Sequence, residues 1–249
     1  MKEQIDTIPV TDAFSRDDEC PFCYLERQAE HRALRYIAGP EASYMEPDVR
    51  AVTDAQGFCR HHYKALYEYG NALGNALMLQ TYYVGLQKEF QAQMGSFEMP
   101  AKKGLFAKKQ ASSLPITQWA KEKESSCFLC SRLAYNMRRY YATFFHLLKE
   151  PEFRTSVENS KGFCMHHFRQ LMEMAEEFLP NNQISWFYPT VLALMENNLA
   201  RVQEDIDWFI EKFDYRNAQE PWKNSKDAVP RGMQKLKGSY PSDKPFKQD

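Results

Sequence analysis

The feature that most constrains the fold of this chain is a cysteine and histidine pattern that occurs twice. The first copy has Cys-Pro-Phe-Cys at 20–23 and Gly-Phe-Cys-Arg-His-His at 57–62, and the second has Cys-Phe-Leu-Cys at 127–130 and Gly-Phe-Cys-Met-His-His at 162–167. Between these motifs, Pro-Asp-Val-Arg at 47–50 matches Pro-Glu-Phe-Arg at 151–154. Three matched elements in the same order indicate an internal duplication.

The repeats suggest a division of the chain into four parts. These are a first repeat (1–95), a linker (96–115), a second repeat (116–213) and a polar, basic tail (214–249). Nine of the 20 linker residues are Pro, Ser or Lys, which favours irregular structure. In the tail we predict one short helix at 231–237. We expect the apolar side chains of the tail to dock on the body of the protein: Trp222, Val229, Met233 and Leu236.

Apolar residues recur at helical spacing in both repeats. After Cys130 they alternate steps of four and three (Leu133, Met137, Tyr140, Phe144, Leu147), and the same spacing recurs from Leu192 to Phe213 and from Ala72 to Phe90. No segment shows the period-two alternation of a strand. Pro47 and Pro151 suit the first turn of a helix, where a missing N–H costs nothing. The sequence therefore predicts an all-α, internally duplicated helical bundle with two zinc-clipped repeats.

All six cysteines of the chain fall in the repeated motifs. Zinc takes four ligands in a tetrahedron, and thiolate sulfur with imidazole nitrogen is its usual set. A Cys-x-x-Cys turn supplies two sulfurs, and a Cys-x-x-His pair at a helix start supplies the other two ligands. We predict two Zn²⁺ per chain, with these metal ligands: Cys20, Cys23, Cys59, His62, Cys127, Cys130, Cys164 and His167.

The spacing leaves open whether each Cys-x-x-Cys joins the Cys-x-x-His of its own repeat or of the other repeat. Cys23 and Cys59 are 36 positions apart, and Cys130 and Cys164 are 34 apart. Our structural hypothesis takes the first alternative, in which zinc closes a loop inside each repeat.

Each second motif ends in two histidines, and helix geometry distinguishes them. With about 100° of rotation per residue, His62 lies about 60° from Cys59 on an apolar face, whereas His61 lies about 200° away beside charged side chains. The same geometry favours His167 over His166. We therefore expect His61 and His166 to face solvent and to have no part in binding the metal.

Three thiolates, one neutral imidazole and Zn²⁺ carry a net charge of −1. We consider Arg50 or Arg154 as a nearby cation that would offset it, with exposure on a short helix as the alternative. His31 and His146 have no counterpart in the other repeat and are interpreted as structural or surface residues.

Three alternative roles for the cysteines fit the pattern less well. Buried free thiols would not form two complete matched sets. Disulfides or a redox pair would require an oxidising compartment or a βαβ context. An iron–sulfur cluster usually has four cysteine ligands.

Composition and charge exclude some classes of function. A net charge of −1 argues against nucleic-acid binding, although the tail from Pro221 carries about +4 and Lys102, Lys103, Lys108 and Lys109 lie in the linker. The N-terminal residues do not resemble a secretory signal, and no apolar run reaches the roughly 18 residues of a membrane span. We expect a soluble, cytoplasmic protein without membrane contacts.

The paired C-x-x-C, P-x-x-R and G-F-C-x-x-H pattern resembles a bacterial family that is known only as a domain of unknown function. The resemblance covers roughly residues 17–213. It implies the helical fold and the eight metal ligands, with His62 and His167 in the last motif position. It implies no activity.

Three hypotheses of function follow. The first is a scaffold or interaction module with two structural Cys3His zinc sites and an unknown protein partner. The second is a zinc–thiolate redox or metal-stress sensor. The third is a metal-dependent enzyme with a cleft between the repeats, although no catalytic motif occurs in the sequence and four protein ligands leave no position for water. The first hypothesis is favoured.

Overall fold

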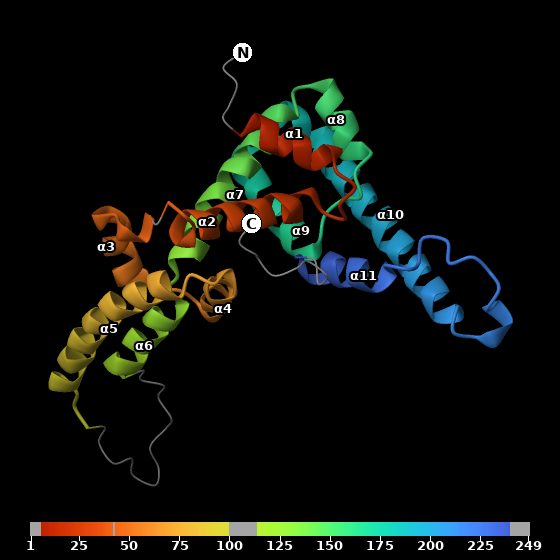
Figure 1. Cartoon of the computed structure of the whole chain (residues 1–249). Helices are drawn as coiled ribbons and strands as arrows, with labels where there is room; N and C mark the ends of the chain where they lie inside the picture. The colour runs from red at the N-terminus through yellow and green to blue at the C-terminus, as the bar shows by residue number, and fades with distance from the viewer. Residues whose placement is uncertain (1–5, 42, 100–113, 240–249) are drawn as a thin grey trace, which may run out of the picture. The chain divides into compact units, whose positions relative to one another are not determined.

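The computed structural model describes residues 6–41, 43–99 and 114–239. These residues form no β-strand, which confirms the predicted all-α fold. Within these residues there are eleven α-helices (Figure 1): α1 (Thr7–Ser15), α2 (Pro21–Ala38), α3 (Pro47–Gln56), α4 (Arg60–Tyr69), α5 (Ala72–Gly95), α6 (Pro115–Ser125), α7 (Phe128–Leu147), α8 (Pro151–Glu158), α9 (Met165–Phe178), α10 (Ile184–Glu211) and α11 (Ala228–Lys237).

Helix starts follow the repeated motifs closely. Pro47 and Pro151 open α3 and α8, as predicted. Cys59 and Cys164 are the extended residues immediately before α4 and α9. Gly57, two positions before Cys59, has a φ of +59°, a conformation that other residues seldom adopt. The motif glycine thus turns the chain so that the cysteine begins a new helix.

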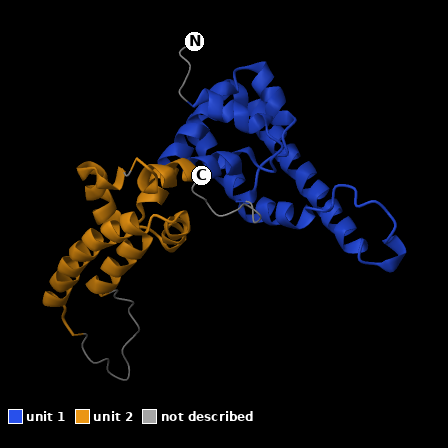
Figure 2. Ribbon diagram, in the orientation of Figure 1, with its two compact units in different colours: residues 1–29, 134–244 blue, residues 30–133, 245–249 orange. Residues whose placement is uncertain are grey.

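The compact units of the structure do not coincide with the two repeats (Figure 2). Unit 1 contains the described parts of 1–29 and 134–244, and unit 2 contains those of 30–133. The boundaries fall inside α2 and α7, which each begin in one unit and end in the other. Each unit therefore combines the start of one repeat with the remainder of the other.

The core of unit 1 shows this exchange in its aromatic side chains. Phe14 of α1 stacks on Phe144 of α7 with ring centroids 5.5 Å apart, and meets Phe153 of α8 edge-on at 5.2 Å. Phe22 of α2 lies 4.4 Å from Tyr141 of α7. All five side chains are buried. Phe14 and Phe22 belong to the first repeat, and the other three belong to the second.

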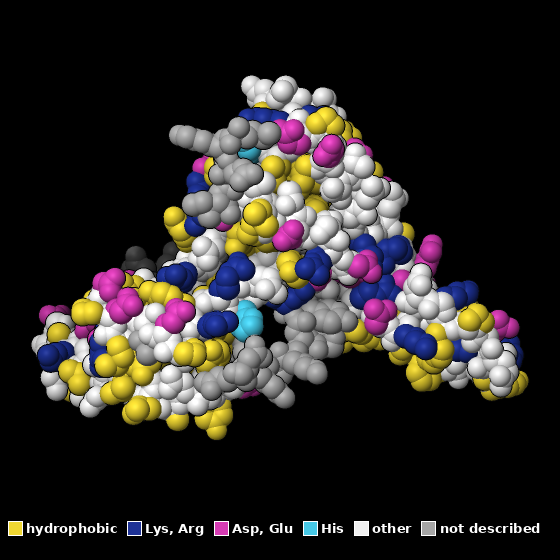
Figure 3. Space-filling model, turned by 45° about the horizontal axis from the view of Figure 1, so that its top comes forward, with side chains coloured by type: hydrophobic (Ala, Val, Ile, Leu, Met, Phe, Trp, Pro, Cys, Tyr) yellow, Lys and Arg dark blue, Asp and Glu magenta, His cyan; other side chains and the backbone are white. Residues whose placement is uncertain are grey.

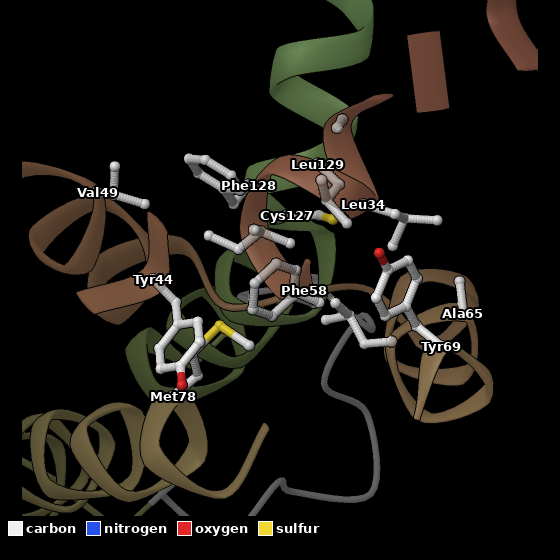
Figure 4. Close-up of a cluster of buried hydrophobic side chains, with 14 residues drawn as sticks. Leu34, Tyr44, Val49, Phe58, Ala65, Tyr69, Met78, Cys127, Phe128 and Leu129 are labelled. Atoms are coloured by element: carbon white, nitrogen blue, oxygen red, sulfur yellow. The ribbon is translucent and has the colours of Figure 1, made fainter. Parts of the chain in front are cut away.

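The core of unit 2 makes the reciprocal exchange (Figure 4). Phe128 and Leu129, at the start of the second repeat's α7, are buried beside Leu34 of α2 and Phe58 of the first repeat. The Phe58 and Phe128 rings meet edge-on at 6.2 Å. The backbone N–H of Phe128 donates to the carbonyl of Gly57 at 3.0 Å. The start of each repeat is thus packed inside the unit that holds most of the other repeat.

The tail helix α11 exists as predicted, but part of its docking face differs. Trp222 does pack on Phe209, with ring centroids 5.8 Å apart. Val229, Met233 and Leu236 are instead exposed. The buried face carries Ala228, Arg231, Gly232, Gln234 and Lys235.

Two physical reasons place this polar face inward. Gly232 permits close approach, because a Cβ there would lie 2.8 Å from Ile206 of α10. The buried cations are neutralised, since Arg231 pairs with Asp205 at 2.9 Å and Lys235 with Glu19 at 3.2 Å.

Two of the predicted segments are described only in part. Residues 100–113 of the linker, including its lysines, and residues 240–249 of the tail lie outside the described residues. None of the helices that the structure describes is long and apolar enough to cross a membrane.

Candidate metal centres

The eight predicted ligands lie in two groups, one in each unit. Cys20, Cys23, Cys164 and His167 form the first cluster, in unit 1. Cys59, His62, Cys127 and Cys130 form the second cluster, in unit 2. Within each group the ligand atoms all lie within 4.8 Å of one another.

Each cluster takes its Cys-x-x-Cys from one repeat and its Cys-x-x-His from the other. This corrects the expectation that a metal would close a loop inside one repeat. The exchanged packing of α1 and the starts of α2 and α7 is the physical reason, because it carries each Cys-x-x-Cys into the opposite unit. Cys23 and Cys164 are 141 positions apart, and Cys59 and Cys130 are 71 apart.

In the first cluster, the Nδ1 atom of the His167 imidazole faces the three sulfurs. It lies 3.1 Å from Sγ of Cys164, 3.4 Å from Cys23 and 3.5 Å from Cys20. The sulfurs of Cys23 and Cys164 are 3.6 Å apart. All four residues are buried, and His167 has no exposed surface.

In the second cluster, Nδ1 of His62 occupies the same position. It lies 3.2 Å from Sγ of Cys127, 3.3 Å from Cys59 and 3.4 Å from Cys130. The sulfurs of Cys59 and Cys130 are 3.7 Å apart. The burial differs from that of the first cluster, because Cys130 is exposed and Cys59 is half-buried.

These distances fit a tetrahedral thiolate and imidazole site. With Zn–S bonds of about 2.3 Å and Zn–N bonds of about 2.0–2.1 Å, the edges of a tetrahedron measure about 3.8 Å between sulfurs and about 3.6 Å from sulfur to nitrogen. A disulfide would need sulfurs about 2.05 Å apart, and all six cysteines are free. The donor atoms present therefore fit a tetrahedral metal ion.

The candidate ligand residues lie at or next to the N-terminal ends of helices. The second cysteine of each Cys-x-x-Cys lies in the first turn of α2 or α7, and the cysteine of each Cys-x-x-His precedes α9 or α4. The N–H of His167 points to Sγ of Cys164 at 3.4 Å, and the N–H of Cys130 points to Sγ of Cys127 at 3.4 Å. The free N–H groups of a helix start favour negative charge, so they stabilise the thiolate form that binds metal.

The thiol pKa values show how strongly the sulfurs interact. Hydrogen bonds from the thiols of Cys20 and Cys23 lower the pKa of Cys164 to about 4. Hydrogen bonds with Cys164 and Cys20, with burial added, raise the pKa of Cys23. In the second cluster, burial is the largest influence and raises the pKa of Cys127, but the hydrogen bond with His62, the backbone N–H groups of Cys130 and Cys59 and the charge of His62 together outweigh it and bring the value down to about 6. Protein groups alone stabilise only part of the thiolate charge that a divalent cation would neutralise.

The adjacent histidines differ in burial and in the direction of the ring. His62 and His167 are buried with Nδ1 directed at the sulfurs, while the side chain of His61 is 69% exposed. His61 is not isolated, however. Its Nε2 lies 2.8 Å from Oε1 of Glu30.

Two carboxylates that the repeated motifs do not contain lie behind the ligand histidines. Oε1 of Glu30 is 3.1 Å from Nε2 of His62, and Oε2 of Glu26 is 3.5 Å from Nε2 of His167. A carboxylate that hydrogen-bonds the far nitrogen of a metal-binding imidazole fixes the ring and its tautomer, but here both Nε2 atoms are buried without a hydrogen bond, so the carboxylates act through charge and proximity. Both residues belong to α2, three and seven positions after Cys23, so helix spacing from the cysteine was the available signal.

The predicted arginine neighbours have other partners. Arg50 donates to the carbonyl of Leu77 at 3.4 Å, and Arg154 donates to the carbonyl of Leu148 at 2.6 Å. These arginines therefore link α3 and α8 to backbone carbonyls rather than to the sulfurs. One cation beside the first cluster is Lys235, whose Nζ donates to the carbonyl of Glu19, next to Cys20, at 2.7 Å.

The end of α11 covers the first cluster. A Cβ at Gly238 would lie 3.3 Å from Sγ of Cys164 and 3.6 Å from Sγ of Cys23. Only glycine allows the backbone to pass this close to the sulfurs without displacement. No described residue covers Cys130 in the same way, which accounts for the unequal exposure of the two clusters.

Unit 2 also contains a pocket of about 180 Å³ between α3, α4 and α5. Its walls are mostly apolar and include Phe58, Leu66, Met78 and Tyr82. None of the eight candidate ligands lines it. The pocket therefore gives no support to chemistry at the metal.

The chain belongs to a family described as a family of unknown function (DUF6062), which matches residues 1–243. The resemblance that the motifs indicate is thereby confirmed, over a longer part of the chain than the motifs cover. No curated protein and no solved structure matches the chain.

Proposed function

We propose that this protein is a zinc-dependent scaffold in which two Cys3His zinc ions hold the exchanged repeats together. The observation that carries this proposal is the composition of each cluster, with two ligands from each repeat. A metal bound in this way links distant parts of the chain. In this role the protein presents stable helical surfaces to a protein partner.

The sequence separations explain why a metal is useful. Fixing Cys23 beside Cys164 closes a loop of 141 positions, and the entropic cost of closure rises with the logarithm of loop length. A metal that binds only the folded state contributes its binding free energy to folding, on the order of 10 kcal/mol for structural zinc. That contribution offsets the cost of closing the loop.

The ligand set favours structure over catalysis. Catalytic zinc generally has three protein ligands and one position for water, whereas each cluster here offers four protein ligands. The closed set of the first cluster is also completely buried. The proposed zinc ions therefore hold the fold rather than activate a substrate.

Zinc content tests the proposal, with matched histidine variants as controls. We expect about two zinc ions per chain in the purified protein. His62→Ala or His167→Ala should reduce this to about one. Since losing a bound metal is among the large destabilising changes, the melting temperature should fall by roughly 10 °C at 2–4 °C per kcal/mol.

His61→Ala and His166→Ala replace the neighbouring rings, so they should keep two zinc ions and a melting temperature close to that of the parent. Elemental analysis and calorimetry measure both quantities. A protein with fully reduced cysteines and no zinc would remove the basis of the proposal.

The second cluster supports a second candidate function, a zinc–thiolate redox sensor. Its Cys130 is exposed, and Sγ of Cys130 lies 3.7 Å from Sγ of Cys59. With hydrogen peroxide, the two thiolates would lose two electrons and form a disulfide, while the peroxide and two protons become two water molecules. Two of the four ligands would then be lost, and zinc would leave the site.

Peroxide titration distinguishes the two clusters. We expect about one zinc ion per chain to be released first, together with a Cys59–Cys130 disulfide, while Cys20, Cys23 and Cys164 stay reduced. The physical reason is access, because oxidation of a thiolate requires contact with the oxidant. A chromogenic chelator and peptide mass spectrometry give the readout. Equal release from both clusters would argue against a sensor based on the second one.

A further inference from the structure

Helix α5 has an unusual surface for a helix that is mostly exposed. In its 24 residues, Lys88 and Glu89 are the only charged side chains. Glu89 is engaged by α6, through Lys123 at 2.7 Å and the indole N–H of Trp119 at 3.0 Å. A helix that lacks a charged face is usually buried, yet only Gly74 and Met78 of α5 are.

Most of the large exposed apolar residues of α5 lie on one stripe, and Val84 lies beside it. Positions 73, 76, 80, 83, 87, 90 and 94 alternate steps of three and four, the spacing of a coiled-coil seam. The stripe, which we call the α5 seam, consists of Leu73, Ala76, Gln80, Tyr83, Gln87, Phe90 and Met94. All seven residues are exposed, and none is charged. Apolar side chains are visible across the surface of unit 2, at the left of Figure 3.

Unit 1 shows how an equivalent stripe is covered within this chain. The matching long helix, α10, carries Val202 and Ile206 at the same kind of spacing, and α11 packs over them through Gly232. Val202 is buried as a result. The described residues of unit 2 contain no helix that covers the α5 seam. Helix α6 contacts the seam at Phe90, whose ring lies 5.8 Å from that of Trp119 and which stays 44% exposed.

We propose that the α5 seam is a self-association surface, occupied by α5 of a second copy of this chain in antiparallel orientation. The pattern of side-chain sizes is self-complementary. With a two-fold axis near Tyr83, small Ala76 faces the partner's large Phe90, and the leucine end of the seam faces the methionine end. Because no residue of the α5 seam is charged, pairing two seams does not place like charges opposite each other.

The size of the seam matches such an interface. A helix of 24 residues is about 36 Å long at 1.5 Å per residue. With Leu73, Tyr83, Phe90 and Met94 between 44% and 70% exposed, the seven side chains offer on the order of 600 Å² per copy, or about 1,200 Å² for a dimer, the lower limit of stable interfaces. Antiparallel packing also opposes the two helix dipoles favourably. These features fit a dimer that dissociates on dilution.

Sedimentation over a range of protein concentrations tests the proposal on the full-length, zinc-loaded protein. We expect a reversible monomer–dimer equilibrium. Tyr83→Glu and Tyr83→Lys should each weaken the dimer at least tenfold, because each places two like charges beside the two-fold axis. Mixing the two variants in equal amounts should restore association, since opposite charges then meet at the axis.

The matched control is Ile210→Glu, which places the same charge on an exposed apolar position of α10 and should leave the dimer unchanged. Circular dichroism confirms that each variant is folded. A parent protein that stays monomeric up to about 200 μM overturns the proposal. A dimer that both Tyr83 variants leave intact, or a mixture that does not associate better than either variant alone, overturns it as well.

Discussion

A chain cut between residues 100 and 113 after folding is expected to remain one particle while zinc is bound. A protease site inserted in this segment would divide the protein into its two repeats. Each product supplies two ligands to both clusters. Each product also buries aromatic or aliphatic side chains in the unit that holds most of the other product, as Phe14 does beside Phe153. Separation would therefore require breaking two metal sites and two cores together.

Size-exclusion chromatography and fragment exchange measure this outcome. The cut protein should elute with the uncut one, and an isotope-labelled fragment added in excess should not exchange over hours. After chelation only the packed side chains remain to hold the fragments. The particle should then dissociate on dilution, so its elution should depend on protein concentration. Fragments that separate while zinc is bound would mean that each repeat holds its own metal.

From local patterns alone, the sequence predicts most of the helices, but not α1 or α6, and the eight candidate ligand residues. The period of apolar residues identifies α7 and α10, and the positions of Pro47 and Pro151 identify two helix starts. The rotation of about 100° per residue separates His62 from His61. Each of these inferences depends on residues a few positions apart, where backbone geometry alone relates them.

The pairing of the motifs lies beyond such local patterns. The chain contains two Cys-x-x-Cys and two Cys-x-x-His motifs, so both pairings offer zinc the same ligands. The choice depends on packing of residues far apart in the chain, such as Phe14 with Phe144 and Phe128 with Phe58. The sequence does not predict that the polar face of α11 points inward for a similar reason, because the partners of Arg231 and Lys235, Asp205 and Glu19, lie far away in the chain.

Removal of both zinc ions is expected to lower the melting temperature by roughly 20 °C, about twice the fall for one histidine variant, while most of the far-UV helical signal remains at 25 °C. The stabilisation by a bound metal depends on its free concentration relative to Kd, so in a purified sample each site contributes a few kcal/mol rather than its whole binding free energy, at about 2–4 °C per kcal/mol. The helices should persist because their apolar stripes pack without metal, as the buried aromatic core of unit 1 shows. Calorimetry and circular dichroism before and after chelation provide the comparison.

Hydrogen exchange should locate the loss and show that it occurs in two steps. The second cluster should lose its metal first, because Cys130 is exposed, so protection should fall at 58–63 together with 126–131. The first cluster lies beneath Gly238 and should follow at higher chelator concentration, with loss at 17–24 together with 163–168.

If each cluster takes ligands from both repeats, each step should lower the protection of one segment from each repeat. Loss at 17–24 together with 58–63 would indicate pairing within one repeat. Unchanged protection at all four segments after confirmed zinc removal would show that the metal does not hold the fold. A sensing or catalytic metal would then account for the ligands better.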